Sequence, residues 1–231
     1  MSKMLLRVRH EIVENADFGA VMASDTIIQS LKLEQSFERH THKRPLGHPL
    51  GRLLRLILNN YCAGRTSKNK LGKWYADQSA LQERLKLDPV DLNHQDAYRP
   101  LDYLDDRAQA AILNDCLIVL VTEFGFDLSL LYEDTSSSYF EGEKCPLAGQ
   151  GYSRDRRPDR PQVNYDVGVL PGGFPARMGV YGGKVPDNRV IDQVSDEWAQ
   201  QHPGERTVLV LDRGMTLWRN RVRIIANRQG Y

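Results

Sequence analysis

Two apolar stretches that flank a Pro-Gly-Gly turn constrain the fold of this chain more than any other feature. The first, Gln162 to Leu170 (QVNYDVGVL), alternates between apolar and polar residues, as a strand with two different faces does. The turn PGGF at Pro171 to Phe174 leads into the second stretch, Pro175 to Tyr181. We therefore predict two antiparallel strands joined by a hairpin, which commits this half of the chain to a β-sheet.

Further elements from Phe126 onward extend this sheet. The segment LSLLYED predicts a strand over Leu128 to Glu133, and TVLVLD predicts a buried strand over Thr207 to Asp212. Between the hairpin and the last strand, Asp187 to Gln201 has helical character, with Asp187 or Asn188 as its N-cap. The order strand, hairpin, helix, strand is typical of a mixed sheet flanked by helices.

The first hundred or so residues have the spacing of helices instead. The clearest apolar stripe recurs at i, i+3, i+4, i+7, i+8 and i+11, and consists of Leu50, Leu53, Leu54, Ile57, Leu58 and Tyr61. Pro49 suits the first turn of this helix and Gly64 its end. Other helices are predicted over 18–37, 79–86, 93–103 with Asn93 as N-cap and a kink at Pro100, and from Asp105 or Asp106 to Phe124, ended by Gly125.

Composition fits a protein of the cytoplasm. The 231 residues are 41% hydrophobic and 26% charged, and no run approaches the roughly 18 apolar residues of a membrane helix. The N-terminus becomes acidic before the apolar core of a signal peptide can form. The three cysteines, Cys62, Cys116 and Cys145, are too far apart for a zinc knuckle, so we expect them to be reduced. No membrane partner is expected.

Charge is distributed unevenly along the chain, although the formal net charge is only +1. From Phe37 to Lys73 nine basic residues face a single acid, Glu38, which gives this segment a charge of +8. A cluster of this kind is typical of a surface that binds nucleic-acid phosphates. The candidate DNA-binding residues of this segment are Arg39, Lys43, Arg44, Arg52, Arg55, Arg65, Lys68, Lys70 and Lys73.

Two carboxylates lie at the predicted ends of core strands. Asp134 ends LSLLYED, and Asp212 ends TVLVLD. If the two strands are neighbours in one sheet, both carboxylates emerge close together and can share a divalent cation, which prefers oxygen ligands. Taken singly, an aspartate at a strand end is more often a turn or capping residue. The pair favours a metal site only modestly.

Several motifs in the second half resemble bacterial insertion-sequence transposases of the DDE class. They are YEDTSSSYFEGE from Tyr132, GYSRDRRPDRPQV at Gly151 to Val163, FPARMGVYGG, and VLVLDRGM at Val208 to Met215. The similarity also includes RLLRLILNNYCAGR and EFGFDLSLLYEDT upstream. The resemblance therefore covers the chain from about Phe18 to Met215.

This resemblance implies a ribonuclease-H-like fold that binds two magnesium ions. In it, an Asp at the end of the first strand, an Asp after the fourth strand and a Glu on a later helix are the ligands, so Asp134 and Asp212 take the first two roles. Two metal ions can activate the attacking oxygen and stabilise the leaving oxygen of a phosphodiester. No acidic residue follows Asp212, so the third ligand is missing from this sequence. We expect a core truncated before its third carboxylate, with little or no activity.

The resemblance also gives the expected organisation and partners. Residues 1–105 would be a helical DNA-binding region, 106–125 a connecting helix and 126–231 the incomplete ribonuclease-H-like core. DNA, as element ends and as target, is the expected partner, and a homodimer is compatible with the sequence. In the loop RDRRPDRP, the four candidate DNA contacts are Arg154, Arg156, Arg157 and Arg160, and equally these arginines could pair with Asp155 and Asp159. Arg213, beside Asp212, could orient a phosphate or lie on a plain surface.

Three functional hypotheses follow from these residues. The first is a transposase that cleaves DNA and transfers strands with magnesium. The second is a DNA-binding remnant of a transposase without catalysis. The third is a structural or protein-binding domain, which would depend on neither metal nor DNA. Cleavage that requires Asp134 and Asp212 separates the first from the second.

Overall fold

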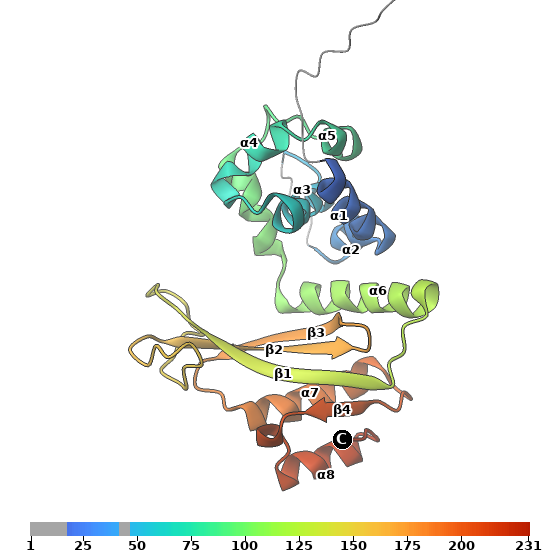
Figure 1. The fold of residues 1–231 in the computed structure, drawn as a ribbon, viewed down its shortest axis with the longest axis vertical. Coiled ribbons are helices and arrows are strands. Elements are labelled where there is room, and N and C mark those ends of the chain that lie inside the picture. Colours follow the sequence, from blue (N-terminus) through green and yellow to red (C-terminus); the bar gives the residue numbers. More distant parts are fainter. Residues whose placement is uncertain (1–17, 42–46) are drawn as a thin grey trace, which may run out of the picture. The chain divides into compact units, whose positions relative to one another are not determined.

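The computed structural model describes residues 18–41 and 47–231 and shows a mixed α+β protein (Figure 1). The chain forms two compact units, which divide between Gln109 and Ala110. The first unit consists of helices, and the second contains a four-stranded sheet with helices. None of the helices in the described ranges combines the length and the apolar character that crossing a lipid bilayer requires.

The helical unit begins with two helices where the spacing predicted one. Its elements are α1 (Phe18–Ser30), α2 (Leu33–His40), α3 (Leu50–Asn59), a π-helical turn (Asn60–Gly64), a 3-10 turn (Lys68–Lys70), α4 (Leu71–Ala76) and α5 (Ser79–Leu85). Lys32 separates α1 from α2 because its backbone is left-handed, with φ of 55°. A left-handed residue cannot continue a right-handed helix, so the chain changes direction there.

Helix α3 is the centre of this unit. Leu53 and Leu56 on α3 are almost fully buried, and they pack with Val21, Leu71, Tyr75, Leu81, Leu85, Leu87 and Ala97. Leu56 lies off the predicted apolar stripe, and Tyr61, which lies on it, is 80% exposed. The stripe was therefore only partly correct, because neighbouring helices enclose α3 on more than one side.

The segment after α5 forms two short 3-10 helices, His94–Ala97 and Arg99–Tyr103, where one kinked helix was predicted. Asn93 is the N-cap, as expected: its side chain accepts a hydrogen bond from Gln95 N, and Asp96 accepts one from Asn93 N. Helix α6 (Asp106–Phe124) then follows, and Gly125 ends it with φ of 68°. The boundary between the two units lies within α6.

The sheet of the second unit has the order β3-β2-β1-β4. The strands are β1 (Leu130–Tyr139), β2 (Gln162–Leu170), β3 (Phe174–Gly182) and β4 (Val208–Leu211). β1, β2 and β3 pair antiparallel, and β2 and β3 form the predicted hairpin. β4 pairs parallel with β1 after the crossover helix α7 (Asp187–Gln201). The outer edge of β4 pairs with Gly230, which follows helix α8 (Trp218–Ala226), a helix that the sequence did not predict.

Alternation in a strand usually places apolar residues on the buried face of a sheet and polar residues on the exposed face, but this sheet departs from that rule on both faces. One face carries buried polar residues, including Glu133, Asp166 and Arg177. The other carries exposed apolar side chains, among them Tyr132, Tyr165, Met178, Val180, Val208 and Val210. Helix α7 meets the polar face, since Arg177 on β3 reaches Glu197 of α7. The sheet therefore buries a charged cluster together with leucines such as Leu131, Leu170 and Leu209.

Candidate active site

Asp134 lies in the middle of β1 and not at its end. The strand was predicted to stop at Glu133, but it continues to Tyr139, so Thr135, Ser136, Ser137 and Ser138 belong to it. Hydroxyl residues did not end the strand because Thr135 and Ser137 are buried, and Arg154 donates to the hydroxyls of both, from Nη2 to Thr135 and from its backbone N–H to Ser137. Asp134 itself is exposed.

The parallel pairing of β1 and β4 brings the two candidate metal ligands to neighbouring positions. Glu133 is the partner of Leu211 in this ladder, and Asp134 and Asp212 are the residues that follow them directly. Asp212 keeps extended backbone angles, with φ of −69° and ψ of 155°. Adjacent strands lie about 4.8 Å apart, so if the pairing continues by one residue the two carboxylates can reach one cation.

Both aspartates lie on the same side of the sheet. Side chains alternate along a strand, and Tyr132 and Val210, two residues before Asp134 and Asp212, are partners that are both exposed. Asp134 and Asp212 therefore face solvent on the apolar side of the sheet. Asp212 accepts a hydrogen bond from Arg213 N at 2.6 Å through one carboxylate oxygen, Oδ1. Arg213 is also exposed.

A complete metal cage does not surround this pair. No group of three or more His, Cys, Asp and Glu residues within residues 18–41 and 47–231 has the arrangement that holds a metal ion. Magnesium is nevertheless often held by one or two carboxylates, with water and substrate phosphate as its other ligands. The two aspartates fit this mode, in which bound DNA would complete the coordination.

On the opposite face, the residue next to Asp134 belongs to a buried charge cluster that the sequence did not reveal. Arg177 donates hydrogen bonds to Glu133, Asp166, Tyr181 and Glu197, so three carboxylates surround one guanidinium. Tyr181 also donates to Asp166. Polar residues at every second position of β2 were the available signal, but alternation alone does not say which face is buried.

Burial in this cluster raises the pKa of Glu133 to about 7. Loss of hydration has the largest effect, the charge of Arg177 opposes it, and the nearby charge of Asp166 adds to it. The same burial lowers the pKa of Arg177, but the charges of Glu133 and Asp166 outweigh it and raise that pKa overall. One guanidinium cannot neutralise three carboxylates, so Glu133 takes up a proton more easily than an ordinary glutamate.

Among the residues predicted to bind DNA, Arg55 is in the wrong place for that role. Its side chain is buried, and it donates to Asp25 at 2.7 Å through both Nε and Nη2 and to Glu34 at 2.6 Å through Nη1. Asp25 is fully buried and also accepts from Asn59 and Arg84. Arg55 lies on the inner side of α3, so it stabilises the helical unit and is not available to a DNA phosphate.

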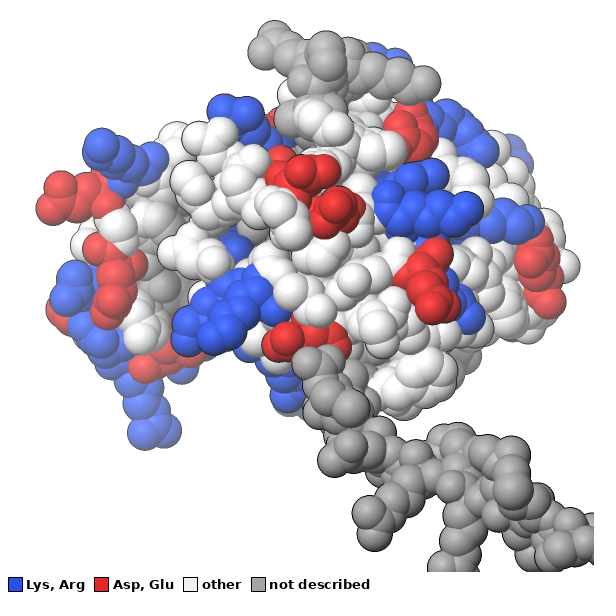
Figure 2. Space-filling model, turned by 90° about the horizontal axis from the view of Figure 1, so that it is seen from above, with Lys and Arg blue, Asp and Glu red and all other residues white. Residues whose placement is uncertain are grey.

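Other basic residues of this segment are at the surface. Arg39, Arg65, Lys68, Lys70 and Lys73 are exposed, and Arg52 is partly exposed, 3.7 Å from Glu34. Lys43 and Arg44 lie outside the described residues. In Figure 2, Lys and Arg side chains alternate with Asp and Glu on the visible face, so the charge that is segregated along the sequence is mixed in this view.

The arginine-rich loop pairs largely with its own acids. Arg157 forms two hydrogen bonds to Asp159, at 2.9 and 2.8 Å, and stacks over the ring of Tyr139. Arg160 lies 3.5 Å from the same carboxylate. Arg156 is exposed, with a left-handed φ of 57°. The interpretation of local Arg–Asp pairs thus holds for Asp159, while Asp155 accepts from the backbone N–H of Tyr139.

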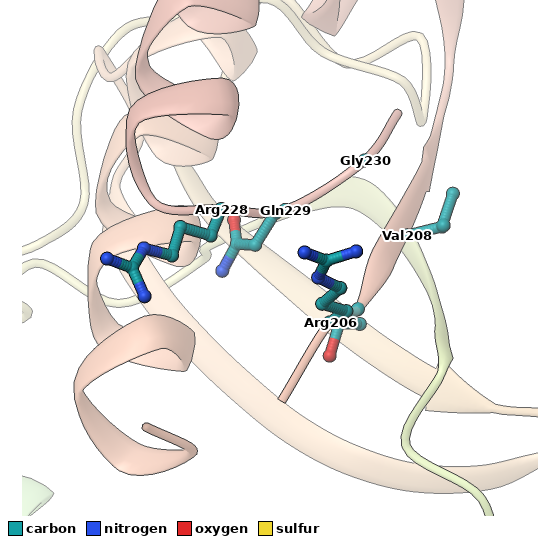
Figure 3. A pocket seen from close by; sticks show the side chains of 6 residues that line it. Arg206, Val208, Arg228, Gln229 and Gly230 are labelled. Atoms are coloured by element: carbon teal, nitrogen blue, oxygen red, sulfur yellow. The ribbon is translucent and has the colours of Figure 1, made fainter. Parts of the chain in front are cut away.

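Among the described residues, two prominent cavities border the sheet unit, and neither is lined by Asp134 or Asp212. The larger, about 590 Å³, is lined by Arg206, Thr207, Val208, Arg228, Gln229 and Gly230. Figure 3 shows Arg206 pointing toward Gln229 and Gly230, while Arg228 points away from them. This cavity lies at the first residue of β4, whereas Asp212 follows the last. The second cavity, about 340 Å³, lies between Tyr152 and the start of α7.

Comparisons of the chain with models of protein families, with curated proteins and with solved structures found no match.

Proposed function

We propose that this protein is a DDE-type transposase, which cleaves DNA and transfers strands with magnesium bound by Asp134 and Asp212. The observation that carries the proposal is the β1–β4 register, which brings these two carboxylates to neighbouring positions on one exposed face. A ribonuclease-H-like core is the fold we propose for the sheet unit. Its support is that the first and fourth strands, at which the resemblance expects the two aspartates, are neighbours in the sheet.

In this mechanism Asp134 and Asp212 would hold magnesium against a DNA phosphate. When bound, the metal would polarise the scissile phosphate and stabilise the leaving oxygen. Asp134 lies on β1, a long strand that pairs with β2 on one side and β4 on the other. Asp212 lies in the turn after β4, where its carboxylate accepts a hydrogen bond from Arg213 N. Arg213 would contact the phosphate next to the metal. The exposed residues Arg39, Arg52, Arg65, Lys68, Lys70 and Lys73, with Arg156, would position DNA through its phosphates.

The test is cleavage of a supercoiled plasmid that carries an element end, with and without magnesium. We expect weak magnesium-dependent nicking that Asp134→Asn and Asp212→Asn each abolish. Glu141→Gln is the matched control, because Glu141 is an exposed carboxylate near Asp134 in sequence that is not part of the pair. Nicking that persists in both Asn variants would overturn the assignment of the site.

A second function, DNA binding without cleavage, is favoured by the absence of a three-ligand group among the described residues. In that case the protein would bind element ends with an affinity that falls steeply with salt, by about 0.9 log units per phosphate contact for each log unit of salt. No nicking would appear with any divalent cation. Binding and cleavage measured on the same DNA therefore separate the two functions.

A further inference from the structure

The second cavity combines the groups that recognise a nucleotide base. We name it the β3–α7 pocket, and its lining includes the side chains of Tyr152, Arg154, Asn164, Lys184 and Asp187. Its volume of about 340 Å³ is at the lower end of the range for small-ligand sites, roughly 300 to 1,000 Å³. Its lining comes from three separate parts of the sheet unit: the segment that leads into the arginine-rich loop together with the first residue of that loop, β2, and the connection from β3 into α7.

Asn164 lies in the wall of this pocket and has an unused hydrogen-bond acceptor. It is 8% exposed, and its amide nitrogen donates to Val185 O at 2.8 Å. Its side-chain oxygen is buried and has no hydrogen-bond partner. An unpaired buried acceptor costs about 1 to 3 kcal/mol, so a ligand with an N–H group gains by reaching it.

The remaining groups suit the rest of a nucleotide. Arg154 donates to Asp187 at 2.8 Å and to Thr135 at 3.0 Å, which fixes a cation and an acceptor side by side at the pocket. Lys184 is exposed and can contact a phosphate. Tyr152 is 81% exposed, and its ring is available for stacking on a base. Donors, acceptors, a cation and an aromatic ring together match a base with its phosphate better than a simple anion, which Asp187 would repel.

The backbone shapes the pocket so that side chains cannot fill it. A Cβ on Gly183 would lie 2.0 Å from Gln162 O, and one on Gly151 would lie 1.8 Å from Gly183 O. The two glycines therefore let the segment with Tyr152 approach the end of β3 closely. This close approach holds Tyr152 and Lys184 on the same cavity.

We propose that the β3–α7 pocket binds one unpaired nucleotide of a DNA strand, with Tyr152 stacked on the base and Asn164 accepting a hydrogen bond from it. The inference rests on the proposed function, since it takes DNA as the ligand, and it adds that this DNA is locally unpaired. The same chemistry would suit a free nucleotide, so the experiment compares both sources.

The test measures binding, without divalent metal, to a short duplex that has one unpaired 2-aminopurine nucleotide. The fully paired duplex, a duplex whose unpaired nucleotide lacks its base, and free 2-aminopurine nucleoside monophosphate are the comparisons. We expect the unpaired base to strengthen binding about tenfold over both duplex comparisons, as one stacked base does. Free nucleotide should bind far more weakly, and 2-aminopurine fluorescence should be quenched on stacking.

Tyr152→Ala should abolish this preference, and Tyr152→Phe should keep it. Tyr61→Ala is the matched control, because Tyr61 is as exposed as Tyr152 but lies in the helical unit, and it should leave the ratio unchanged. Equal binding to the paired and unpaired duplexes, a preference that survives Tyr152→Ala, tighter binding of the free nucleotide, or no DNA binding at all would each overturn the proposal. Loss of cleavage with the preference retained would contradict only the proposed function.

Discussion

Glu133 and Asp134 are neighbours in sequence, yet their side chains leave β1 on opposite faces of the sheet. Glu133 is 4% exposed and bound to Arg177, whereas Asp134 faces solvent beside the position of Asp212. The buried cluster and the candidate active site therefore share one strand but no side chain. Variants of Glu133 can test the cluster through stability, and variants of Asp134 can test catalysis.

Glu133→Gln should remove a pH dependence of stability. The folded pKa of Glu133 is raised to about 7 from an ordinary 4.5, so its stabilising effect is complete below pH 4.5 and is lost as the pH rises through 7. At about 1.4 kcal/mol per pKa unit, the loss is on the order of 3 kcal/mol. Urea unfolding at pH 5 and pH 8 should show that the free energy of unfolding of the variant, relative to that of the natural protein, is higher at pH 8 than at pH 5. A difference that is independent of pH would contradict this.

Asp25→Asn should destabilise the helical unit by about 3 to 5 kcal/mol, because it leaves the buried Arg55 without its main counter-charge. Burial acts to raise the pKa of Asp25, but hydrogen bonds and charge from Arg55 outweigh it and lower the pKa overall. The stabilisation is therefore present above about pH 4 and lost as the pH falls. Asp196→Asn is the control: its partner Arg223 is 49% exposed, so thermal unfolding should change by less than about 1 kcal/mol.

Gly183→Ala and Gly182→Ala should differ sharply although they are adjacent. A Cβ on Gly183 would lie 2.0 Å from Gln162 O and 2.6 Å from Gly149 O, both backbone atoms that cannot move freely. One on Gly182 would meet Leu147 O at an ordinary 3.7 Å. We expect Gly183→Ala to cost about 1 to 3 kcal/mol or more in urea unfolding. Gly182→Ala should cost less than that, and equal effects would rule out the close backbone approach.

Lys86→Gly should stabilise the helical unit by up to about 1 kcal/mol. Lys86 follows α5 with a left-handed backbone, φ of 50° and ψ of 43°, a conformation that glycine adopts without steric cost. Lys73→Gly, inside α4, should instead destabilise by about 1 kcal/mol, since glycine is a poor helix former. Thermal denaturation that moves in the same direction for both variants would contradict the assigned backbone conformation of Lys86.

Local signals in the sequence located most elements correctly. The Pro-Gly-Gly turn fixed the β2–β3 hairpin, Asn93 was the N-cap that the sequence indicated, and Gly125 ended α6. Helix α7 has the predicted bounds, Asp187 to Gln201, but its N-cap is Pro186 and not Asp187 or Asn188. These features depend on residues within a few positions of each other, so the sequence alone determines them.

Features that depend on distant residues were not predictable in this way. The continuation of β1 through Thr135 and Ser137 depends on Arg154, and the burial of Arg55 depends on Asp25. No local pattern distinguishes such a buried arginine from the exposed Lys68 or Lys73. For the candidate site, Asp134 and Asp212 could be named from the sequence. That their strands are neighbours became known only from the register between β1 and β4.

β4 is only four residues long, and its contacts with β1 join parts of the chain that are far apart. Thr207, just before β4, donates to Leu128 O across 79 residues of sequence. Such distant pairings form slowly in folding, because a long loop must close first. If this short strand detaches, the two aspartates separate while the hairpin of β2 and β3 remains paired. Hydrogen exchange at the amide of Val208, which donates to Ser129 O on the β1 side of β4, would therefore report how often the candidate site comes apart.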